Sequence, residues 1–351
     1  MDIAPHGSLT EGQKRLTSGI MTPMYEWPGT IEEFRREMTE WLTEIESHIW
    51  PRWVPGSGWQ GASDAFAESD TRFELEKATE LYHGSGNHPD ILEEMPDIPE
   101  APDKRQRDHL WHYRVEDAWN IDVRFKFARE GDPEEPTVDF QASDGGGGSN
   151  IGLYLSGEDK KGYKRLIWLR MRGVQPPLFD IKGYFQRPRP WALATKFGLS
   201  DFRWHMAEGY VHTGLHPSLL SGHCIQGILG GCTIFDAVLD DIKRGGEGLS
   251  YDEIRGLQKY MVDYGDRRVF AGVHYMTDNI ASWTLARRLI PHLFRNGEKV
   301  LNFAVGAIVG QSRVFNDLMD DRMFPETFAF KRFLKARFPE GGDPSYGTRS
   351  R

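Results

Sequence analysis

Cysteine is scarce in this sequence, and so are long apolar runs. Its two cysteines, Cys224 and Cys232, are too few for the disulfide framework of a secreted domain. If both stand on one helix, they are separated by roughly 12 Å, which is too far for a disulfide between them. No stretch approaches the roughly eighteen apolar residues of a membrane span, and Met1 to Leu16 hold no secretory signal. We therefore expect a cytoplasmic protein without a membrane span.

Basic residues are outnumbered by acidic ones, 43 to 52. The formal net charge of the 351 residues is −9, which argues against a general nucleic-acid binder, because such proteins usually present a basic face. A local basic pocket is still compatible with this total. A chain of this length can bury a full core, either as one large domain or as two small ones.

Regular alternation of strands with helices is the third absence, and the periodic segments indicate helices instead. Thr30 to Glu33 have the form of a capping box, and an apolar face follows through about His48. Other N-terminal segments are predicted as a loop at 51–63 and helices at 68–83 and 104–120. We therefore predict a mostly α fold.

A glycine-rich, acidic stretch at 131–150 divides the chain. No lysine follows its run Gly145 to Gly148 as one would in a phosphate-binding loop, so a flexible loop is the better interpretation. This stretch is the predicted boundary between two parts. Residues 1–150 form an N-terminal helical and loop region packed on the core, and residues 151–351 form a catalytic helical bundle.

The C-terminal part contains the most apolar predicted helix, which starts at Ser221 and ends at Lys243. Pro176-Pro177 is expected to break the chain before it, and Ser250 to Glu253 form a second capping box after it. Further helices are predicted at 266–289, 298–318 and 326–336, followed by a frayed tail.

Ser221-Gly222-His223 is the first of three polar groups with chemical potential. Ser221 stands near a helix N-terminus, where free backbone N–H groups and the helix dipole favour an anion. Gly222 lets an oxyanion approach the backbone, and His223 stands where an imidazole can pass a proton. Taken alone, the tripeptide is better explained as a plain serine N-cap.

Arg268, His274 and Asp278 are the second group. On a helix over 267–289, His274 and Asp278 are one turn apart on the same face. The carboxylate can then accept the Nδ1 proton and leave Nε2 as a nucleophile or ligand. Arg268 could reach the same anion from the start of that helix. A solvated His–Asp pair is the simpler alternative.

Lys182 and Arg189 are the third group. Lysine supplies a point charge and arginine a bidentate fork, the two usual means of holding phosphoryl oxygens. Ordinary surface charge is the simpler alternative for each, and Arg187-Pro188-Arg189-Pro190 is also compatible with a stiff polyproline-like turn.

The order and spacing of the three groups carry more information than any one of them. Lys-x6-Arg-Pro, Ser-Gly-His and Arg-x5-His-x3-Asp together resemble the signature of the type-2 phosphatidic acid phosphatase/vanadium haloperoxidase superfamily, over about residues 176–290. The resemblance implies a helical bundle. Leu220 departs from the proline that usually precedes Ser-Gly-His, and Arg267 replaces a common serine.

The resemblance also implies a role for each matched residue. It makes His274 the group bonded to phosphorus or vanadium, Asp278 the residue that orients it, and His223 the acid/base residue. The residues implied to bind the oxyanion are Lys182, Arg189, Ser221, Gly222 and Arg268. Residues 1–150 lie outside the resemblance.

Two activities share these residues. A phosphatase would hydrolyse a phosphoric ester or diphosphate through a phosphohistidine, without a metal or cofactor. A haloperoxidase would hold vanadate on His274 and oxidise halide with hydrogen peroxide, with an organic halide acceptor as its second substrate. His216 resembles a histidine of bromide-oxidising members, although it can equally cap the loop. Cys224 and Met276 argue against hypohalous chemistry, because sulfur is readily oxidised.

We rank a phosphatase acting on a small phosphate ester first, and a haloperoxidase second. A bundle that binds phosphate without turnover is a third hypothesis. The sequence leaves a homo-oligomer open.

Overall fold

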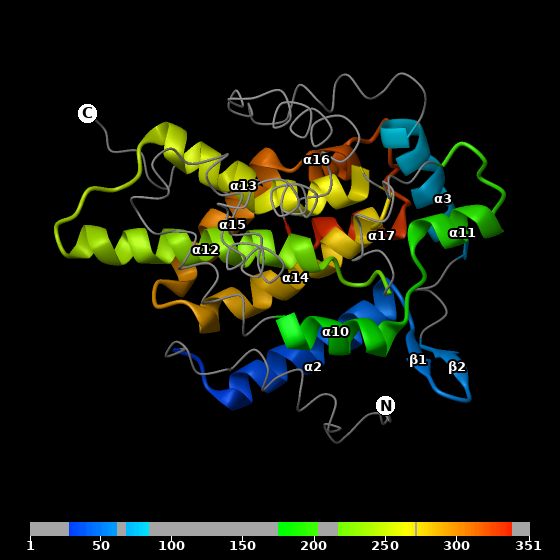
Figure 1. The fold of residues 1–351 in the computed structure, drawn as a ribbon, viewed down its shortest axis with the longest axis horizontal. Helices are drawn as coiled ribbons and strands as arrows, with labels where there is room; N and C mark the ends of the chain where they lie inside the picture. Colours follow the sequence, from blue (N-terminus) through cyan, green and yellow to red (C-terminus); the bar gives the residue numbers. More distant parts are fainter. Residues whose placement is uncertain (1–27, 62–67, 84–174, 203–216, 271, 339–351) are drawn as a thin grey trace, which may run out of the picture.

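The structure is a computed structural model, and it describes residues 28–61, 68–83, 175–202, 217–270 and 272–338 (Figure 1). It is mostly helical, which confirms the predicted fold class at that level. The predicted helix at 104–120, the boundary loop at 131–150, the tail and His216 lie outside the described residues.

The predicted apolar helix from Ser221 is confirmed as α12 (Gly222–Lys243), which runs from the middle of the molecule to its left edge in Figure 1. Ser221 caps it, because its hydroxyl accepts a hydrogen bond from the N–H of Cys224 at 3.3 Å. The helices that pack against α12 are α13 (Tyr251–Phe270), α14 (Met276–Leu293) and α15 (Gly297–Gln311).

By length and composition, α12 could cross a membrane, and it is the one helix of the described residues that passes this test. However, 78% of its apolar window is buried inside the structure. Since the core helix of a folded domain has the same composition, this is weak evidence for a span. Both cysteines lie on α12 as free, buried thiols.

Small residues on α12 allow its close approach to α13. A Cβ atom on Gly227 would stand 2.8 Å from both the carbonyl oxygen of Met261 and the Cβ of Tyr264. A Cβ on Gly231 would stand 2.1 Å from the Cγ of Met261. These distances are far below van der Waals contact, so the packing of the two helices depends on both glycines.

Gly227→Ala is therefore expected to destabilise the protein by about 1–3 kcal/mol, because the new methyl group meets backbone that cannot rotate away. Gly310→Ala, on α15, is the matched control, since nothing lies within 4 Å of its Cβ position. It is expected to be neutral or to stabilise by up to about 1 kcal/mol through helix propensity. Urea unfolding midpoints measure both effects, and equal shifts would contradict this account.

The single helix predicted at 266–289 is wrong, because α13 ends and α14 begins inside it. Gly272 has a φ of 69°, the left-handed conformation that commonly ends a helix. The N–H groups of Val273 and His274 then both donate to the carbonyl of Arg268, each at 3.2 Å. His274 consequently lies before α14 rather than on it, and Arg268 lies on the preceding helix.

The helix predicted at 298–318 is also two helices, α15 and α16 (Arg313–Met319). Ser312 separates them and caps α16 through the N–H of Phe315 at 3.0 Å. Asp266 of α13 accepts hydrogen bonds from the Ser312 hydroxyl and the Arg313 N–H. The final predicted helix is confirmed as α17 (Ala329–Lys335).

Two proline- and glycine-rich predictions need correction. Pro176-Pro177 does not break the chain but lies in the first turn of α10 (Gln175–Phe185), where a missing N–H costs nothing. The predicted loop at 51–63 contains an antiparallel hairpin, β1 (Arg52–Val54) and β2 (Gly58–Gln60). Trp53 pairs with Trp59 across it, with ring centroids 4.9 Å apart.

The first predicted helix is confirmed as α2 (Ile31–His48), including its Thr30–Glu33 capping box. Its apolar face packs against α14 (Figure 1), and the indole N–H of Trp41 donates to the carbonyl of Ala281 at 3.1 Å. The described N-terminal helices therefore share one hydrophobic core with the C-terminal helices.

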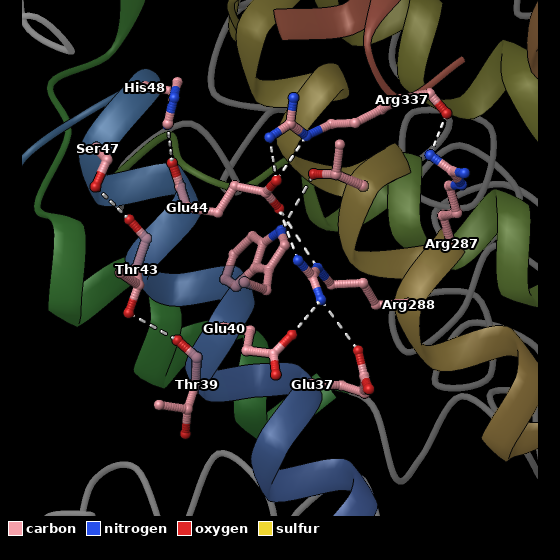
Figure 2. A network of polar contacts seen from close by, with 12 residues as sticks. Glu37, Thr39, Glu40, Thr43, Glu44, Ser47, His48, Arg287, Arg288 and Arg337 are labelled. Atoms are coloured by element: carbon pink, nitrogen blue, oxygen red, sulfur yellow. Dashed lines mark hydrogen bonds and ion pairs between the residues drawn. The ribbon is translucent and has the colours of Figure 1, made fainter. Parts of the chain in front are cut away.

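A network of ion pairs flanks this packing (Figure 2). Arg288 of α14 reaches Glu37, Glu40 and Glu44 on successive turns of α2, with N···O distances of 3.0–3.3 Å. Arg337, just after α17, pairs with Glu44 as well. These partly exposed contacts fix the register of α2 on α14 more than they add stability.

The helix predicted at 68–83 is confirmed as α3 (Glu68–Ala78), which continues into a π-helical turn, η1 (Thr79–His83). It packs beside α11 (Pro190–Lys196) (Figure 1). This places α3 close to the segment between α10 and α11.

Candidate functional site

Five segments converge where the three polar groups of the sequence meet. They are the ends of α10 and α13, the extended segment 187–189, and the N-termini of α12 and α14. The hydroxyl of Ser282 on α14 joins the last two, because it approaches the carbonyls of Asp278 at 2.8 Å and Ser221 at 3.1 Å. Residues nearly a hundred positions apart are thereby held in one place.

His274 and Asp278 form a direct hydrogen bond at the N-terminus of α14. The Nδ1 of His274 lies 2.8 Å from the Oδ2 of Asp278, which also accepts the N–H of Tyr275 at 3.1 Å. Since an ionised carboxylate can only accept, the proton of the imidazole stands on Nδ1. Nε2 then carries the lone pair, and it lies within hydrogen-bond distance of Arg189. The contact between Nδ1 and Asp278 is the one that the sequence predicted.

Arg189 lies on the other side of the imidazole. Its Nη1 is 3.0 Å from the Nε2 of His274 and also donates to the carbonyl of Val273. The residue is only 5% exposed, and Arg189 starts α11 in an extended conformation. Its side chain therefore points at the Nε2 of His274.

Lys182 makes different contacts from those of a simple anion ligand. Its Nζ donates to the carbonyls of Pro217, Ser218 and Leu220, at 2.8, 2.9 and 2.7 Å. These three bonds use every ammonium proton and fix the loop that leads into Ser221. Lys182 nevertheless lies close enough to His274 to act on it through its charge.

The electrostatics of the site are dominated by crowded, buried cations. Burial, with the nearby charges of Arg189, Lys182 and Arg268, holds the pKa of His274 well below its usual value. Burial and Arg189 likewise depress the pKa of Lys182, and burial and Arg268 lower that of Arg189 to about 9. A bound anion would offset this repulsion, so the cluster is suited to an oxyanion.

The Ser-Gly-His tripeptide opens α12 at the edge of this cluster. Ser221 is fully buried, whereas Gly222 and His223 are half-buried. The positive charge of a protonated His223 lowers the pKa of His274, which places the two imidazoles within electrostatic reach of each other. Gly222 and His223 are therefore the less buried residues of the tripeptide.

Arg187 is a central residue that the sequence did not single out. It is fully buried, and its Nη1 donates to the Oδ1 of Asp278 at 2.7 Å and to the hydroxyl of Thr277 at 2.9 Å. Its guanidinium lies 3.8 Å from the ring centroid of Tyr275. Arg187 and Arg189 stand two positions apart in an extended segment, a spacing that puts both side chains on one side.

Glu74 is the second residue that the sequence analysis missed. It comes from α3, in the N-terminal region, and accepts hydrogen bonds from the N–H and hydroxyl of Thr277 at 2.7 and 2.9 Å. Burial raises its pKa to about 7, against the opposing effect of Arg187. A signal was present, because Glu74 occupies a core position in the buried stripe Thr71, Glu74, Leu75 and Ala78.

The structure thus brings together Lys182, Arg189, Ser221, Arg268, His274 and Asp278, with Gly222 and His223 beside them. His216 lies outside the described residues. Within the described part of the chain, no group of three or more His, Cys, Asp or Glu side chains is placed to hold a metal ion.

Comparisons with known proteins give no relative. No family model matches the chain, and no curated protein or solved structure matches it either. The site geometry is therefore the basis for any statement about function.

Proposed function

We propose that this chain is a phosphohydrolase of the type-2 phosphatidic acid phosphatase/vanadium haloperoxidase superfamily, acting through a phosphohistidine on His274. The observation that carries the proposal is the alignment Arg189–His274–Asp278, in which a neutral imidazole donates its Nδ1 proton to a carboxylate and has its Nε2 beside a guanidinium. The hydrogen bond to Asp278 selects the tautomer in which Nε2 can attack, and a phosphoryl oxygen bound by Arg189 would release the Nε2 lone pair for that attack.

In the first step, Nε2 of His274 attacks phosphorus as the phosphorus–oxygen bond to the leaving group breaks. His223 donates a proton to the departing oxygen. The imidazole gains positive charge as it bonds to phosphorus, and Asp278 stabilises that charge through Nδ1–H. Arg189, Arg268 and the N-terminus of α12 face the equatorial oxygens, on which negative charge concentrates.

In the second step, His223 takes a proton from water as the water oxygen attacks the phosphohistidine. The phosphorus–nitrogen bond breaks, His274 returns to its neutral state, and inorganic phosphate leaves. Lys182 contributes its charge to the site while its ammonium holds the loop at 217–220, so that Ser221 keeps its position.

A vanadium haloperoxidase is the alternative that the same donors would serve. Vanadate is a tetrahedral oxyanion like phosphate, and the buried cations that depress the pKa of His274 would attract either anion. Bound vanadate would catalyse the oxidation of halide by hydrogen peroxide. The sulfur atoms of Cys224 and Met276 argue less strongly against it than their sequence positions suggest, because both residues are fully buried.

One divided preparation of metal-free protein tests both activities. The first half is assayed for hydrolysis of p-nitrophenyl phosphate with and without vanadate, and the second is loaded with vanadate and assayed for dye bromination by peroxide and bromide. We expect hydrolysis that vanadate inhibits, and negligible bromination. Strong vanadate-dependent bromination with feeble hydrolysis would overturn the proposal in favour of the haloperoxidase. Tight phosphate binding without either activity would favour a binding protein.

A further inference from the structure

Glu74 is unusual because it is an acidic side chain, 1% exposed, on the core face of a helix that the site motifs do not include. Burying a carboxylate costs several kcal/mol in general unless hydrogen bonds and a countercharge compensate it. An apolar side chain on α3 would avoid that cost. The hydrogen-bond partners of Glu74 indicate what the buried carboxylate does at the N-terminus of α14.

Both oxygens of Glu74 bind the first turn of α14. Oε1 accepts the N–H of Thr277, one of the donors that a helix N-terminus leaves without an intrahelical partner. Oε2 accepts the hydroxyl of Thr277 and lies 3.6 Å from Nη2 of Arg187. Glu74 therefore caps α14 from a different part of the chain.

These contacts continue without a gap to the reacting imidazole. The hydroxyl of Thr277 donates to Glu74 and accepts from Nη1 of Arg187, and the same Nη1 donates to Asp278. Asp278 in turn holds the Nδ1 of His274. Each of these side chains is at most 4% exposed, so water cannot substitute readily for a lost contact.

We propose that Glu74 is a positioning residue of the active site: it fixes Thr277 and Arg187, which hold Asp278 in line with His274. This inference rests on the proposed function, and it makes α3 of the N-terminal region part of the catalytic machinery. Glu74 contacts neither the imidazole nor the cations that would meet the phosphate, so its effect on the site must pass through the hydrogen bonds of Thr277 and Arg187.

Glu74→Gln tests the proposal in the full-length protein. Glutamine keeps the volume, but its amide NH2 cannot accept from Thr277 and must break one of the two bonds. We expect kcat for p-nitrophenyl phosphate to fall about 10–100-fold, the size of effect seen for outer-shell partners that orient metal-binding histidines. KM is expected to change less than about twofold, because the oxyanion donors are untouched. Glu76→Gln, on the exposed face of the same helix, is the control and should match the wild type.

A nuclear magnetic resonance measurement separates this inference from the proposed function. The Nδ1 proton of His274, held by Asp278, should give a low-field resonance in the wild type that is weakened or lost in Glu74→Gln. This readout needs no turnover, so it tests the positioning even if no ester is hydrolysed. A folded Glu74→Gln protein with an unchanged resonance would overturn the inference, as would an unchanged kcat in an active enzyme.

A second variant covers the case in which Glu74→Gln does not fold. Thr277→Val removes the bridging hydroxyl, preserves its shape, and leaves the bond from the Thr277 N–H to Glu74 in place. We expect the same direction of change in kcat and in the His274 resonance, with a smaller size. If both measurements equal those of the wild type, the chain of contacts does not position His274, and the inference is wrong.

Discussion

Replacing His274 by alanine is expected to lower kcat for phosphate-ester hydrolysis at least about 1,000-fold, because it removes the group that we propose to bond to phosphorus. The imidazole is buried and its Nε2 faces Arg189 at 3.0 Å, so a water molecule in the resulting space would have no comparable nucleophilicity. Stability should fall only modestly, since Asp278 keeps its hydrogen bonds from Arg187 and from the N–H of Tyr275.

The proposed phosphohistidine intermediate gives this prediction an independent measurement. A radiolabelled phosphate ester, quenched in alkali because acid breaks phosphorus–nitrogen bonds, should label the wild type and leave His274→Ala unlabelled. His292→Ala is the matched control, because this histidine lies at the other end of α14 and is partly exposed beside Glu33 and Glu37. Hydrolysis by His274→Ala within about tenfold of the wild type would contradict the nucleophile assignment.

Local signals in the sequence predicted the starts of α2, α12 and α13. Thr30–Glu33 and Ser250–Glu253 both form the reciprocal bonds of a capping box, and Ser221 caps α12. Each signal is contained within four consecutive residues, so the sequence holds all of the required information. The helix ends were less well predicted. The apolar periodicity of the sequence continues across Gly272, but the helical backbone ends there.

Within the site, the sequence predicted residues that share a short motif but not the contacts between distant segments. Spacing within motifs indicated His274 and Asp278, whose contact spans four positions. Glu74 and Thr277 are 203 positions apart, and no local pattern specifies such a pairing. The contacts of Lys182 with three carbonyls were equally hidden, because they depend on the path of a loop rather than on residue type.

Arg187→Met is expected to cause the largest loss of stability, about 3–5 kcal/mol, because it removes one partner of a buried ion pair. Arg187 is fully buried between Asp278, at 2.7 Å, and Glu74, at 3.6 Å. Methionine fills much of the same space but leaves both carboxylates without their shared cation. Urea unfolding measures the loss, and Arg187→Lys, which keeps the charge without the fork, should lose less.

The loss should also depend on pH in a defined direction. The folded-state pKa of Glu74 is already raised from 4.5 to about 7, and removing Arg187 takes away an effect that lowers it. A carboxyl with a raised folded-state pKa stabilises the protein fully at low pH, and that contribution is lost as the pH rises through the folded pKa. The difference between Arg187→Met and the wild type should therefore be larger at pH 8.5 than at pH 6.

A surface control shows what the loss of an exposed arginine does to stability. Arg322→Ala removes an arginine that pairs with Asp320 but whose side chain is 87% exposed, and its unfolding midpoint should stay at the wild-type value.

A double variant separates the charge of Arg187 from its packing. Adding Glu74→Gln to Arg187→Met removes a carboxylate that has lost its cation, so the double variant should be more stable than the sum of the single losses predicts. Strictly additive losses, independent of pH, would mean that Arg187 acts through its packing on Tyr275 and Trp50 rather than through its charge.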